Sequence, residues 1–289
     1  MDVEAISIEG GDVLHRAGGE MTSRPHIVGY QFARRIREIG SEVDNRVVGE
    51  RVVATVPTGS HAEIASVAAH GTWRVPDGMA LERAACVPIP FGTADDCLFE
   101  FGGLEPGESV LVQGGGGGVG LATIQLAKRH GAMVFATASN DGKLARLADL
   151  GVDHGINYVE RDLVPEIMRL TDGRGIDLVV DPIGGDVLQS SLECLAYRGR
   201  LVTVGNMSRA DRQIDISTLS QGNRSISGVF LGAEMGQSRV NDIIDGHITA
   251  VAAGDLQVVI DRRFPLAEAV QAHAYIESRQ AFRRVLLIP

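Results

Sequence analysis

The chain has 289 residues, which is enough for one large or two medium domains. Hydrophobic residues make up 44% and charged residues 22%, a balance typical of folded globular proteins and not of disordered, coiled-coil or collagen-like chains. The net charge of −10, without a long run of Lys or Arg, argues against nucleic acid as a main partner.

The N-terminus carries no basic region followed by an apolar stretch, and no run of about 18 apolar residues occurs along the chain. We therefore expect a cytoplasmic protein with no membrane partner. The three cysteines, Cys86, Cys97 and Cys194, are widely spaced in apolar surroundings. Their number and setting favour buried thiols in a reducing compartment over a disulfide framework.

From Met1 to about Phe91 the chain shows short β-like runs separated by turns. One run covers residues 51–56, a turn follows at 57–60, and a second run covers 62–67. This texture predicts a separate, mostly β unit.

From Glu105 onward, short apolar runs alternate with amphipathic helical patterns, for example at 120–128 and 143–150. Each apolar run predicts a buried parallel strand. The alternation of strand and helix predicts a doubly wound α/β domain. The predicted strands lie at 109–113, 133–137, 155–158, 176–181 and 201–205.

The C-terminal segment differs from both regions. A predicted helix at 267–277 is followed by a strand-like run at 284–288. A terminal strand needs a neighbour to satisfy its backbone groups, and we expect the N-terminal β unit to provide it.

A glycine-rich loop follows the strand predicted at 109–113. Gly115, Gly117 and Gly120 fit the G-x-G-x-x-G spacing, which alone is a weak signal in a chain with 36 glycines. Here, however, a strand ends in the loop and an amphipathic helix starts from it. Such a loop lets the backbone approach a pyrophosphate, whose charge is stabilised by the N–H groups at the helix start. We therefore expect a bound dinucleotide, with a merely flexible loop as the alternative.

The end of the next strand predicts which dinucleotide binds. A ribose with a free 2′-OH is commonly held there by Asp or Glu, whereas this chain has Ala138. Ser139, Asn140 and Lys143 follow and offer donors for a 2′-phosphate, which favours NADPH. Asp141 argues against NADPH, because it lies just past the usual acidic position. The stretch of residues 140–142 also fits a turn that caps the following helix.

These motifs resemble those of the quinone oxidoreductase branch of the medium-chain dehydrogenase/reductase superfamily, over the chain from about Val3 to Pro289. The resemblance implies a Rossmann doubly wound parallel sheet domain at 94–253. It also implies a GroES-like mostly-β catalytic domain, N-terminally shortened relative to the family, at 1–93 and 254–289. The resemblance rests on Gly117–Ala122, Gln125–Lys128, Lys143–Leu144, Ile156–Tyr158, Asp181–Gly185 and Gly199–Gly205.

The resemblance further implies a small-molecule substrate and a homodimer. Family members pair through the edge strand of the Rossmann sheet, and the apolar run at 226–231 matches that strand.

The resemblance also implies roles for single residues in cofactor binding. For Thr93 and Tyr158, a hydroxyl that is bonded locally and serves only packing is an equal alternative. The expected pyrophosphate contacts are Gly117, Gly118, Val119 and Gly120, next to Gly115; the adenosine end is expected at Ser139, Asn140, Lys143 and Tyr158, and the nicotinamide near Thr93, Gly205, Asn206, Phe230 and Leu231.

Zinc-dependent relatives place a cysteine and a His-Glu pair at positions that here read Glu9, Tyr30 and Gln31. Only Glu9 is a zinc donor, and three cysteines do not make the four-cysteine zinc lobe of those relatives. We therefore expect no metal and a direct hydride transfer from NADPH to a quinone, an enone or an enoyl-type C=C bond. The proton would come from solvent or from a hydroxyl such as that of Tyr30. The other catalytic candidates are Thr93 and Glu9, which replaces a common Asn and would be able to act as a base.

Two alternative functions stay open. The first is a non-reductive biosynthetic enzyme on the same scaffold, motivated by Glu9. The second is a nucleotide-binding regulatory protein without catalysis, motivated by the shortened N-terminus. Two further expectations concern charge: Arg34, Arg35 and Arg37 should be solvated, and the eight histidines, which show no metal-ligand spacing, should be exposed or hydrogen-bonded.

Overall fold

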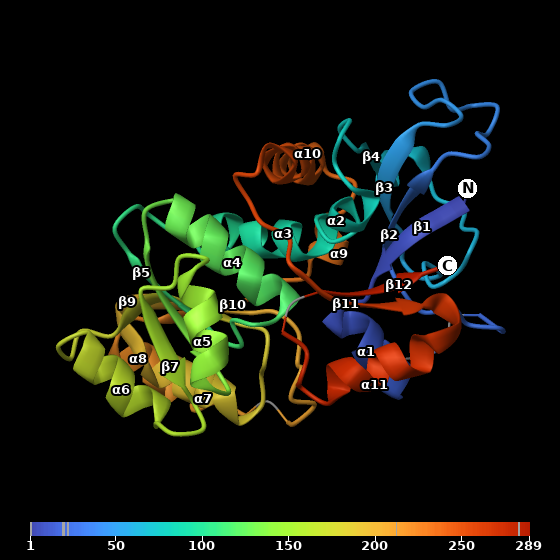
Figure 1. Ribbon diagram of the computed structural model, residues 1–289. Helices are drawn as coiled ribbons and strands as arrows, with labels where there is room; N and C mark the ends of the chain where they lie inside the picture. The colour runs from blue at the N-terminus through green and yellow to red at the C-terminus, as the bar shows by residue number, and fades with distance from the viewer. Residues whose placement is uncertain (1, 19–20, 22, 212, 283) are drawn as a thin grey trace. The chain divides into compact units, whose positions relative to one another are not determined.

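The computed structural model describes residues 2–18, 21, 23–211, 213–282 and 284–289 (Figure 1). The chain divides into two units: the first runs to Gly92 and resumes at Leu231, and the second is Thr93–Phe230. Within the described residues, none of the helices combines the length and the apolarity that crossing a membrane requires.

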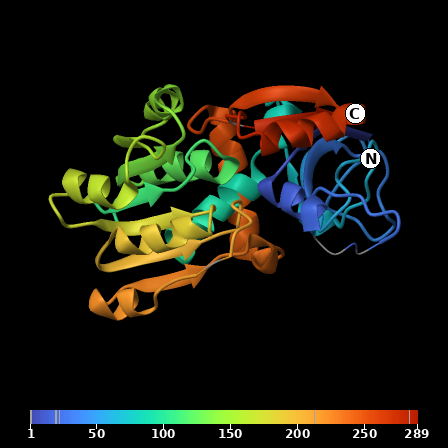
Figure 2. The same ribbon diagram turned by 90° about the horizontal axis from the view of Figure 1, so that it is seen from below.

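The second unit is built on a six-stranded parallel sheet in the order β10-β9-β8-β5-β6-β7. The helices α4 and α5 pack on β5, β6 and β7. The helix α7 packs on β8 and β9 and also contacts α6 and α8. Helices therefore cover both faces of the sheet (Figure 2). The strands are β5 (Ser109–Val112), β6 (Met133–Ala138), β7 (His154–Asn157), β8 (Ile176–Asp181), β9 (Leu195–Thr203) and β10 (Ser225–Gly228); the helices are α4 (Gly118–Arg129), α5 (Asp141–Ala148), α6 (Leu163–Leu170), α7 (Asp186–Glu193) and α8 (Ser217–Gln221).

This strand order confirms the predicted doubly wound fold. The order reverses between β5 and β8, which creates the crevice at the carboxyl ends of the strands where such sheets bind ligands. The strands are apolar because both faces are covered, and the core between sheet and helices contains Leu111, Phe135, Ile156 and Ile176, each with no exposed surface.

The first unit carries a second six-stranded sheet, in the order β11-β12-β1-β2-β3-β4. The C-terminal strand β12 pairs antiparallel with β1, with Ile6 opposite Leu287, so the N-terminal β unit hosts it as predicted. The helices α1 and α11 lie side by side (Figure 1), joined by an Arg16–Glu277 ion pair of 2.5 Å. The strands are β1 (Asp2–Ser7), β2 (Gln31–Arg35), β3 (Arg51–Thr55), β4 (Thr72–Arg74), β11 (Ile260–Pro265) and β12 (Arg284–Ile288); the helices are α1 (Gly10–Gly18), α2 (Leu81–Ala84), α9 (Leu231–Glu234), α10 (Ser238–Ala253) and α11 (Ala269–Glu277), and α3 (Pro88–Asp95) contains the first junction.

The second junction lies earlier than the sequence indicated. The boundary expected between residues 253 and 254 moves to Phe230–Leu231. The reason is the attachment of α10 to the first unit: the Trp73 indole donates a hydrogen bond to the Asn241 carbonyl at 3.1 Å, and Arg83 donates one to the Val251 carbonyl at 3.0 Å. These hydrogen bonds join segments far apart in the sequence, so local patterning did not reveal them.

The predicted strand at 62–67 is wrong. Only an isolated bridge at Ile64 forms there, because β1 already has β12 and β2 as neighbours. The segment instead runs alongside β1 as a loop, and the Val3 N–H donates a single hydrogen bond to the Glu63 carbonyl at 2.8 Å.

The expectation of solvated arginines fails for Arg34 and holds for its neighbours. Arg35 and Arg37 are exposed, whereas Arg34 has no exposed surface. Residues two apart in a strand share a face, so Arg34 lies on the buried side with Phe32 and stacks 3.9 Å above its ring. Its guanidinium also donates to the Ala65 carbonyl at 2.7 Å.

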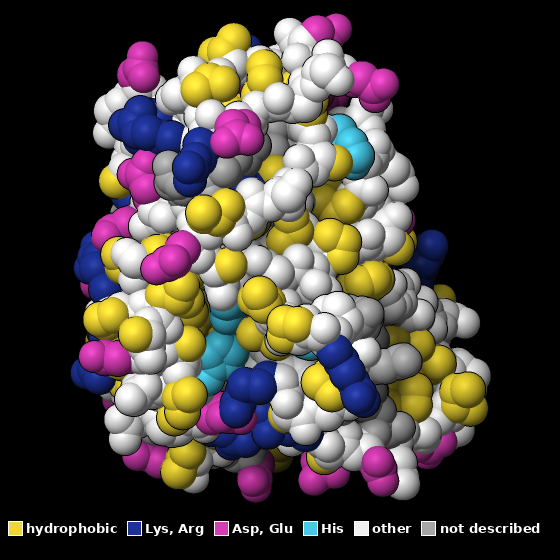
Figure 3. Space-filling model, turned by 90° about the vertical axis from the view of Figure 1, so that its right-hand side faces the viewer, with side chains coloured by type: hydrophobic (Ala, Val, Ile, Leu, Met, Phe, Trp, Pro, Cys, Tyr) yellow, Lys and Arg dark blue, Asp and Glu magenta, His cyan; other side chains and the backbone are white. Residues whose placement is uncertain are grey.

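On the face drawn in Figure 3, acidic and basic side chains are interspersed with hydrophobic ones.

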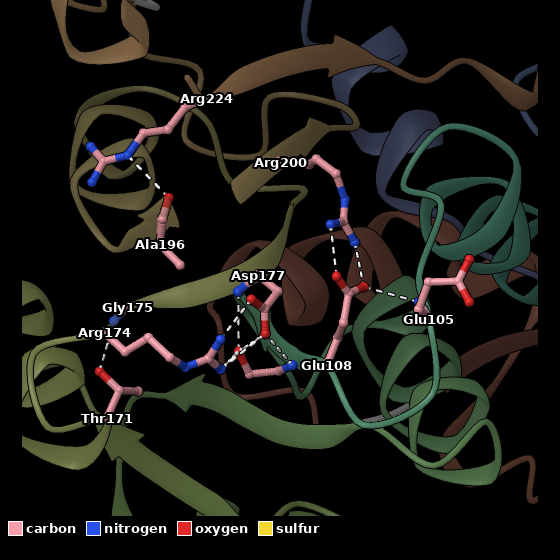
Figure 4. Close-up of polar contacts among 10 residues, drawn as sticks. Glu105, Glu108, Thr171, Arg174, Gly175, Asp177, Ala196, Arg200 and Arg224 are labelled. Atoms are coloured by element: carbon pink, nitrogen blue, oxygen red, sulfur yellow. Dashed lines mark hydrogen bonds and ion pairs between the residues drawn. The ribbon is translucent and has the colours of Figure 1, made fainter. Parts of the chain in front are cut away.

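Two bidentate ion pairs lie at the amino ends of the strands in the second unit (Figure 4). Arg200 on β9 pairs with Glu108 just before β5, at 2.6 and 2.9 Å. Arg174 pairs with Asp177 on β8, whose carboxylate also accepts the Ser109 N–H at 2.8 Å. These pairs lie at the sheet end opposite the glycine loop and tie β5, β8 and β9 together.

We expect Glu108→Gln to lower the free energy of unfolding by about 1 kcal/mol at neutral pH. The Arg200 hydrogen bonds hold the pKa of Glu108 below its ordinary 4.5, so this contribution is present above pH 4.5 and lost as the pH falls below it. Urea unfolding at pH 7 and at decreasing acid pH measures the difference, which should shrink as Glu108 itself becomes protonated. Glu38→Gln, at an exposed pair, is the control and should change little; a loss for Glu108→Gln that is the same at every pH would contradict the assignment.

Candidate functional site

The glycine loop after β5 is tied to the end of β6. Gly114 has a φ of +61°, a conformation that glycine adopts without strain, and its N–H donates to Thr137 Oγ1 at 2.9 Å. The Gly115 N–H donates to the Thr137 carbonyl, also at 2.9 Å. The loop therefore turns sharply off the strand end and stays attached to the neighbouring strand.

The three glycines of the motif meet different surroundings. A Cβ on Gly115 would lie 2.9 Å from the Leu147 side chain, and one on Gly120 would lie 2.6 Å from the Gly114 carbonyl oxygen. Both glycines therefore allow close packing of the loop against helices. A Cβ on Gly117 would meet no atom nearer than 3.5 Å, so this position is open to an incoming ligand.

The helix α4 begins in this loop, with Gly117 as its N-cap and no side chain capping it. Its first residues are Gly118, Val119 and Gly120, whose N–H groups have no partner within the helix. The helix start carries a partial positive charge, which favours an anion there. The residues predicted to contact a pyrophosphate are thus gathered at one place with the chemistry that a pyrophosphate needs.

A chain of buried hydrogen bonds lies beneath the loop. Thr137 Oγ1 donates to Gln113 Oε1 at 2.9 Å, and Gln113 Nε2 donates to Ser191 Oγ at 3.0 Å. Ser191 Oγ then donates to Asp181 Oδ2 at 3.4 Å, while Asp181 Oδ1 accepts the Ile183 and Gly184 N–H groups. These hydrogen bonds were not predicted from the sequence; their signal there is a polar residue at the end of each of the buried strands β5, β6 and β8.

The residues predicted for the adenosine end gather after β6 and β7, where the Tyr158 N–H donates to the Ala138 carbonyl at 3.2 Å. Asn140 Oδ1 accepts the Lys143 N–H at 2.9 Å and caps α5, as the helix-cap alternative proposed. Asp141, the residue that argued against NADPH, accepts a hydrogen bond from the Asn157 amide at 3.1 Å. Its carboxylate is therefore held against β7.

The loops after β8 and β9 lie against each other. A Cβ on Gly184 would lie 2.5 Å from Asn206 Oδ1, and the Met207 N–H donates to the Pro182 carbonyl at 3.2 Å. Gly205, next to Asn206, has a φ of +84°. Gly205 and Asn206, predicted for the nicotinamide end, thus lie where two loops pack together at the carboxyl ends of the strands.

The other residues predicted for that end fall into different settings. Phe230 is 75% exposed, whereas the Leu231 side chain is buried in the first unit, beside Gly92. Thr93 is buried in α3.

In the first unit, the predicted base Glu9 is buried and neutralised. Its carboxylate forms an ion pair with Arg284 and accepts hydrogen bonds from Gln31 and from Ser7 Oγ, the last at 3.1 Å. Burial lowers the pKa of Arg284 to about 9, which leaves the guanidinium charged at pH 7. A carboxylate held in this way is a poor general base.

Tyr30, the predicted proton donor, is half-buried next to Gly11. Its hydroxyl lies so close that a Cβ on Gly11 would come within 2.2 Å of it. Burial, reinforced by the charge of the nearby Asp12, raises the pKa of Tyr30 above its ordinary 10.0. The hydroxyl therefore keeps its proton at neutral pH.

The positions that hold zinc in relatives do not fit a metal. Glu9 already binds Arg284, and Gln31 donates to Glu9 while its carbonyl accepts the Ile89 N–H. Among the residues that the structure describes, no group of three or more His, Cys, Asp or Glu side chains is arranged to hold a metal ion. The absence of a metal stays a prediction, derived from the chemistry of these side chains.

Two histidines depart from the sequence-based expectation. The His61 side chain is 5% exposed and His273 is 3% exposed, and His61 Nε2 and His273 Nδ1 lack hydrogen-bond partners. Their rings meet edge to face, 5.3 Å apart. Because His61 and His273 are far apart in sequence, spacing gave no signal for this contact.

Comparison with known proteins finds family models that match segments of the chain. Residues 1–90 match the family model "Alcohol dehydrogenase GroES-like domain", and residues 118–246 match "Zinc-binding dehydrogenase". The chain is 31% identical to a quinone oxidoreductase of Pseudomonas aeruginosa and 33% identical to a 2-haloacrylate reductase of Burkholderia sp, each over 99% of this chain and 89% of the relative. It is 32% identical to a zebrafish (Danio rerio) synaptic vesicle membrane protein VAT-1 homolog, over 99% of this chain but 63% of that longer protein.

A solved structure gives the same picture. The crystal structure of Escherichia coli quinone oxidoreductase complexed with NADPH matches with a TM-score of 0.95 and 28% identity, covering 100% of this chain and 90% of that one.

We expect Thr137→Val to weaken dinucleotide binding about tenfold. The substitution keeps the shape of the side chain but removes the acceptor of the Gly114 N–H and the link to Gln113, so the loop loses its attachment to β6. Nicotinamide fluorescence measures the dissociation constant. The control is Thr171→Val, which loses two comparable hydrogen bonds, to the Ile167 carbonyl and from the Gly175 N–H, before β8; equal weakening in both variants would show a general loss of stability instead.

Proposed function

Because the chain belongs to the quinone oxidoreductase branch of the medium-chain dehydrogenase/reductase superfamily, we propose that it is an NADPH-dependent reductase of quinones, enones or enoyl-type C=C bonds. The observation that carries the proposal is the glycine loop: it leaves the open Gly117 and the uncapped start of α4 at the switch point of the parallel sheet. The NADPH complex of the E. coli quinone oxidoreductase, which shares this fold, supports the same cofactor.

The residues present fit NADPH. Gly118, Val119 and Gly120 would receive the pyrophosphate at the helix start, and Ser139 with Lys143 would receive the 2′-phosphate after β6. Asp141, the acidic residue nearest to the usual ribose-binding position, is held by Asn157, so it does not compete for a free 2′-OH. Tyr158, Gly205 and Asn206 would line the rest of the site.

When bound, NADPH would supply the hydride that reduces an electron-poor C=C bond or a quinone. The reduced substrate also needs one proton. The proton comes from solvent or from a hydroxyl such as that of Tyr30, whose phenol is protonated at neutral pH. Thr93 remains a candidate for orienting the substrate or the nicotinamide.

The alternatives lose their motivation. A non-reductive enzyme that uses Glu9 as a base does not fit a carboxylate paired with Arg284. The relatives named above include a quinone oxidoreductase and a 2-haloacrylate reductase, which supports a reductase and not a purely regulatory nucleotide-binding protein. We further propose a cytoplasmic location, since Cys86, Cys97 and Cys194 are free, buried thiols suited to a reducing compartment.

We expect Lys143→Gln to weaken NADPH binding about tenfold and to leave NADH binding unchanged, because only NADPH carries the 2′-phosphate. Separate fluorescence titrations with the two cofactors measure the ratio, which for the wild type should favour NADPH at least tenfold. Lys128→Gln is the matched control, since Lys128 lies in the last turn of α4 and pairs with Asp153 at 2.6 Å. A wild type that binds neither cofactor would overturn the proposed function.

We also propose a homodimer joined through β10, which in the described sheet is an edge strand paired with β9. Phe230, Tyr197 and Ile216 in the same unit are at least 70% exposed, which supplies apolar surface for a partner. Two copies paired antiparallel across a two-fold axis would make one continuous sheet and remove the exposed edge. Light scattering should give about twice the chain mass of 30.7 kDa; a mass of one chain would refute the dimer.

A further inference from the structure

The first turn of α5 carries the acidic residue nearest to the position that selects the dinucleotide. Asp141 is the first residue of α5 and follows closely on Ala138, where β6 ends. Its side chain is exposed. A carboxylate at this edge of a Rossmann sheet accepts a hydrogen bond from the free ribose 2′-OH of NADH and repels the 2′-phosphate of NADPH. The direction in which this carboxylate points therefore bears on the choice of cofactor.

Asn157 holds the carboxylate toward β7. Asn157 Nδ2 donates a hydrogen bond to Asp141 Oδ1 at 3.1 Å. Asn157 Oδ1 accepts the Val159 N–H at 3.2 Å, so the oxygen end of the amide is occupied and its nitrogen end faces Asp141. One amide thus joins the turn after β7 to the start of α5.

In this contact the amide is the fixed partner and the carboxylate is the movable one. Asn157 ends β7 opposite Ala138 of β6, and it is 5% exposed. Its carbonyl also accepts the N–H groups of Glu160 and Arg161, at 3.1 and 3.0 Å. A buried side chain held through both its amide and its backbone keeps one arrangement, whereas an exposed aspartate adopts several rotamers unless a partner restrains it.

The packing of α5 on β7 fixes the distance between the two residues. A Cβ on Gly155 of β7 would lie 3.0 Å from the Leu144 side chain of α5, so this glycine lets helix and strand approach closely. Asn140 caps α5 and thereby sets where the helix begins. The backbone of Asp141 therefore has a fixed place beside Asn157, and the hydrogen bond sets the direction of its side chain.

We propose that Asn157 is a specificity-determining residue for the cofactor. By holding the Asp141 carboxylate against β7, it keeps the adenosine end of the site open to a 2′-phosphate and withholds the acceptor that the ribose of NADH would use. The inference rests on the proposed function, which places the 2′-phosphate beside Ser139 and Lys143. Asn157 is a positioning residue that acts through Asp141, and loss of its amide releases the carboxylate of a latent NADH site.

The test is a double-mutant cycle between Asn157→Ser and Asp141→Asn, with the NADPH and NADH dissociation constants measured by nicotinamide fluorescence. A serine is too short to reach Asp141 but is able to accept the Val159 N–H in a similar turn, and it leaves the charge of the site unchanged. We expect Asn157→Ser to weaken NADPH binding about threefold and to tighten NADH binding about threefold, so that the preference for NADPH falls about tenfold.

The other side of the cycle shows whether Asn157 acts through Asp141. In the Asp141→Asn background no carboxylate is left to release, so we expect Asn157→Ser to change the preference by less than about twofold. An equal fall in both backgrounds would overturn the proposal, because Asn157 would then act on the cofactor without Asp141. An unchanged preference in the single variant Asn157→Ser would overturn it as well.

Gln189→Ser is the matched control for the loss of an amide. Gln189 on α7 makes the same two kinds of contact as Asn157: its Nε2 donates to the Glu193 carboxylate at 2.8 Å, and its Oε1 accepts the Asp215 N–H at 2.9 Å. Because α7 packs on β8 and β9, we expect this variant to leave the preference unchanged. A comparable fall in Gln189→Ser would show a general loosening of the unit and overturn the assignment to Asn157.

Failure of the proposed function gives a different result. A wild type that binds NADPH but reduces no quinone or enone loses the proposed reaction, yet the cofactor preference of each variant is still measured by binding alone. An active reductase whose preference ignores Asn157→Ser keeps the proposed function and loses only this inference. A wild type that binds neither cofactor would overturn both.

Discussion

The cofactor site depends on the hydrogen-bond chain that joins the carboxyl ends of β5, β6 and β8. Parallel strands expose their last carbonyl and N–H groups at the edge where a ligand must bind, and loops that leave such ends have few contacts to hold them. Buried side chains beneath the loop provide the missing contacts. They form successive hydrogen bonds from Thr137 to Gln113, Ser191 and Asp181. A fully satisfied buried network is rigid, so the glycine loop rests on a fixed base even though glycine itself is permissive.

The first unit uses two side chains at the predicted zinc-ligand positions for a structural ion pair. Glu9 and Gln31 occupy positions that in zinc-dependent relatives carry ligands, yet both now serve an ion pair that fastens the start of β12 to the end of β1. Breaking such a buried pair by removing one partner leaves an uncompensated charge, which costs about 3–5 kcal/mol. The pair therefore links the two ends of the chain and removes Glu9 from chemistry at the same time.

The sequence predicted most of the second unit and much less of the first. In the Rossmann unit the strands β5 to β9 and the helices α4 and α5 follow from local periodicity, and the glycine loop from its position between β5 and α4. The errors concern contacts between distant segments. Arg34 is buried because Phe32 shares its face, residues 231–253 join the first unit through Trp73 and Arg83, and His61 meets His273 only in the fold. None of these contacts leaves a periodic trace in the sequence.

The buried polar side chains beneath the cofactor loop differ from Asp12, His61 and His273 in the first unit in how their hydrogen bonds are satisfied. Beneath the cofactor loop, Thr137, Gln113, Ser191 and Asp181 form successive hydrogen bonds with one another, as a rigid support for a binding site requires. In the first unit, Asp12, His61 and His273 keep unpartnered atoms although a few apolar substitutions would remove that cost. The fully satisfied hydrogen-bond network therefore matches what NADPH requires of the second unit, a binding loop that holds it in a fixed position for hydride transfer.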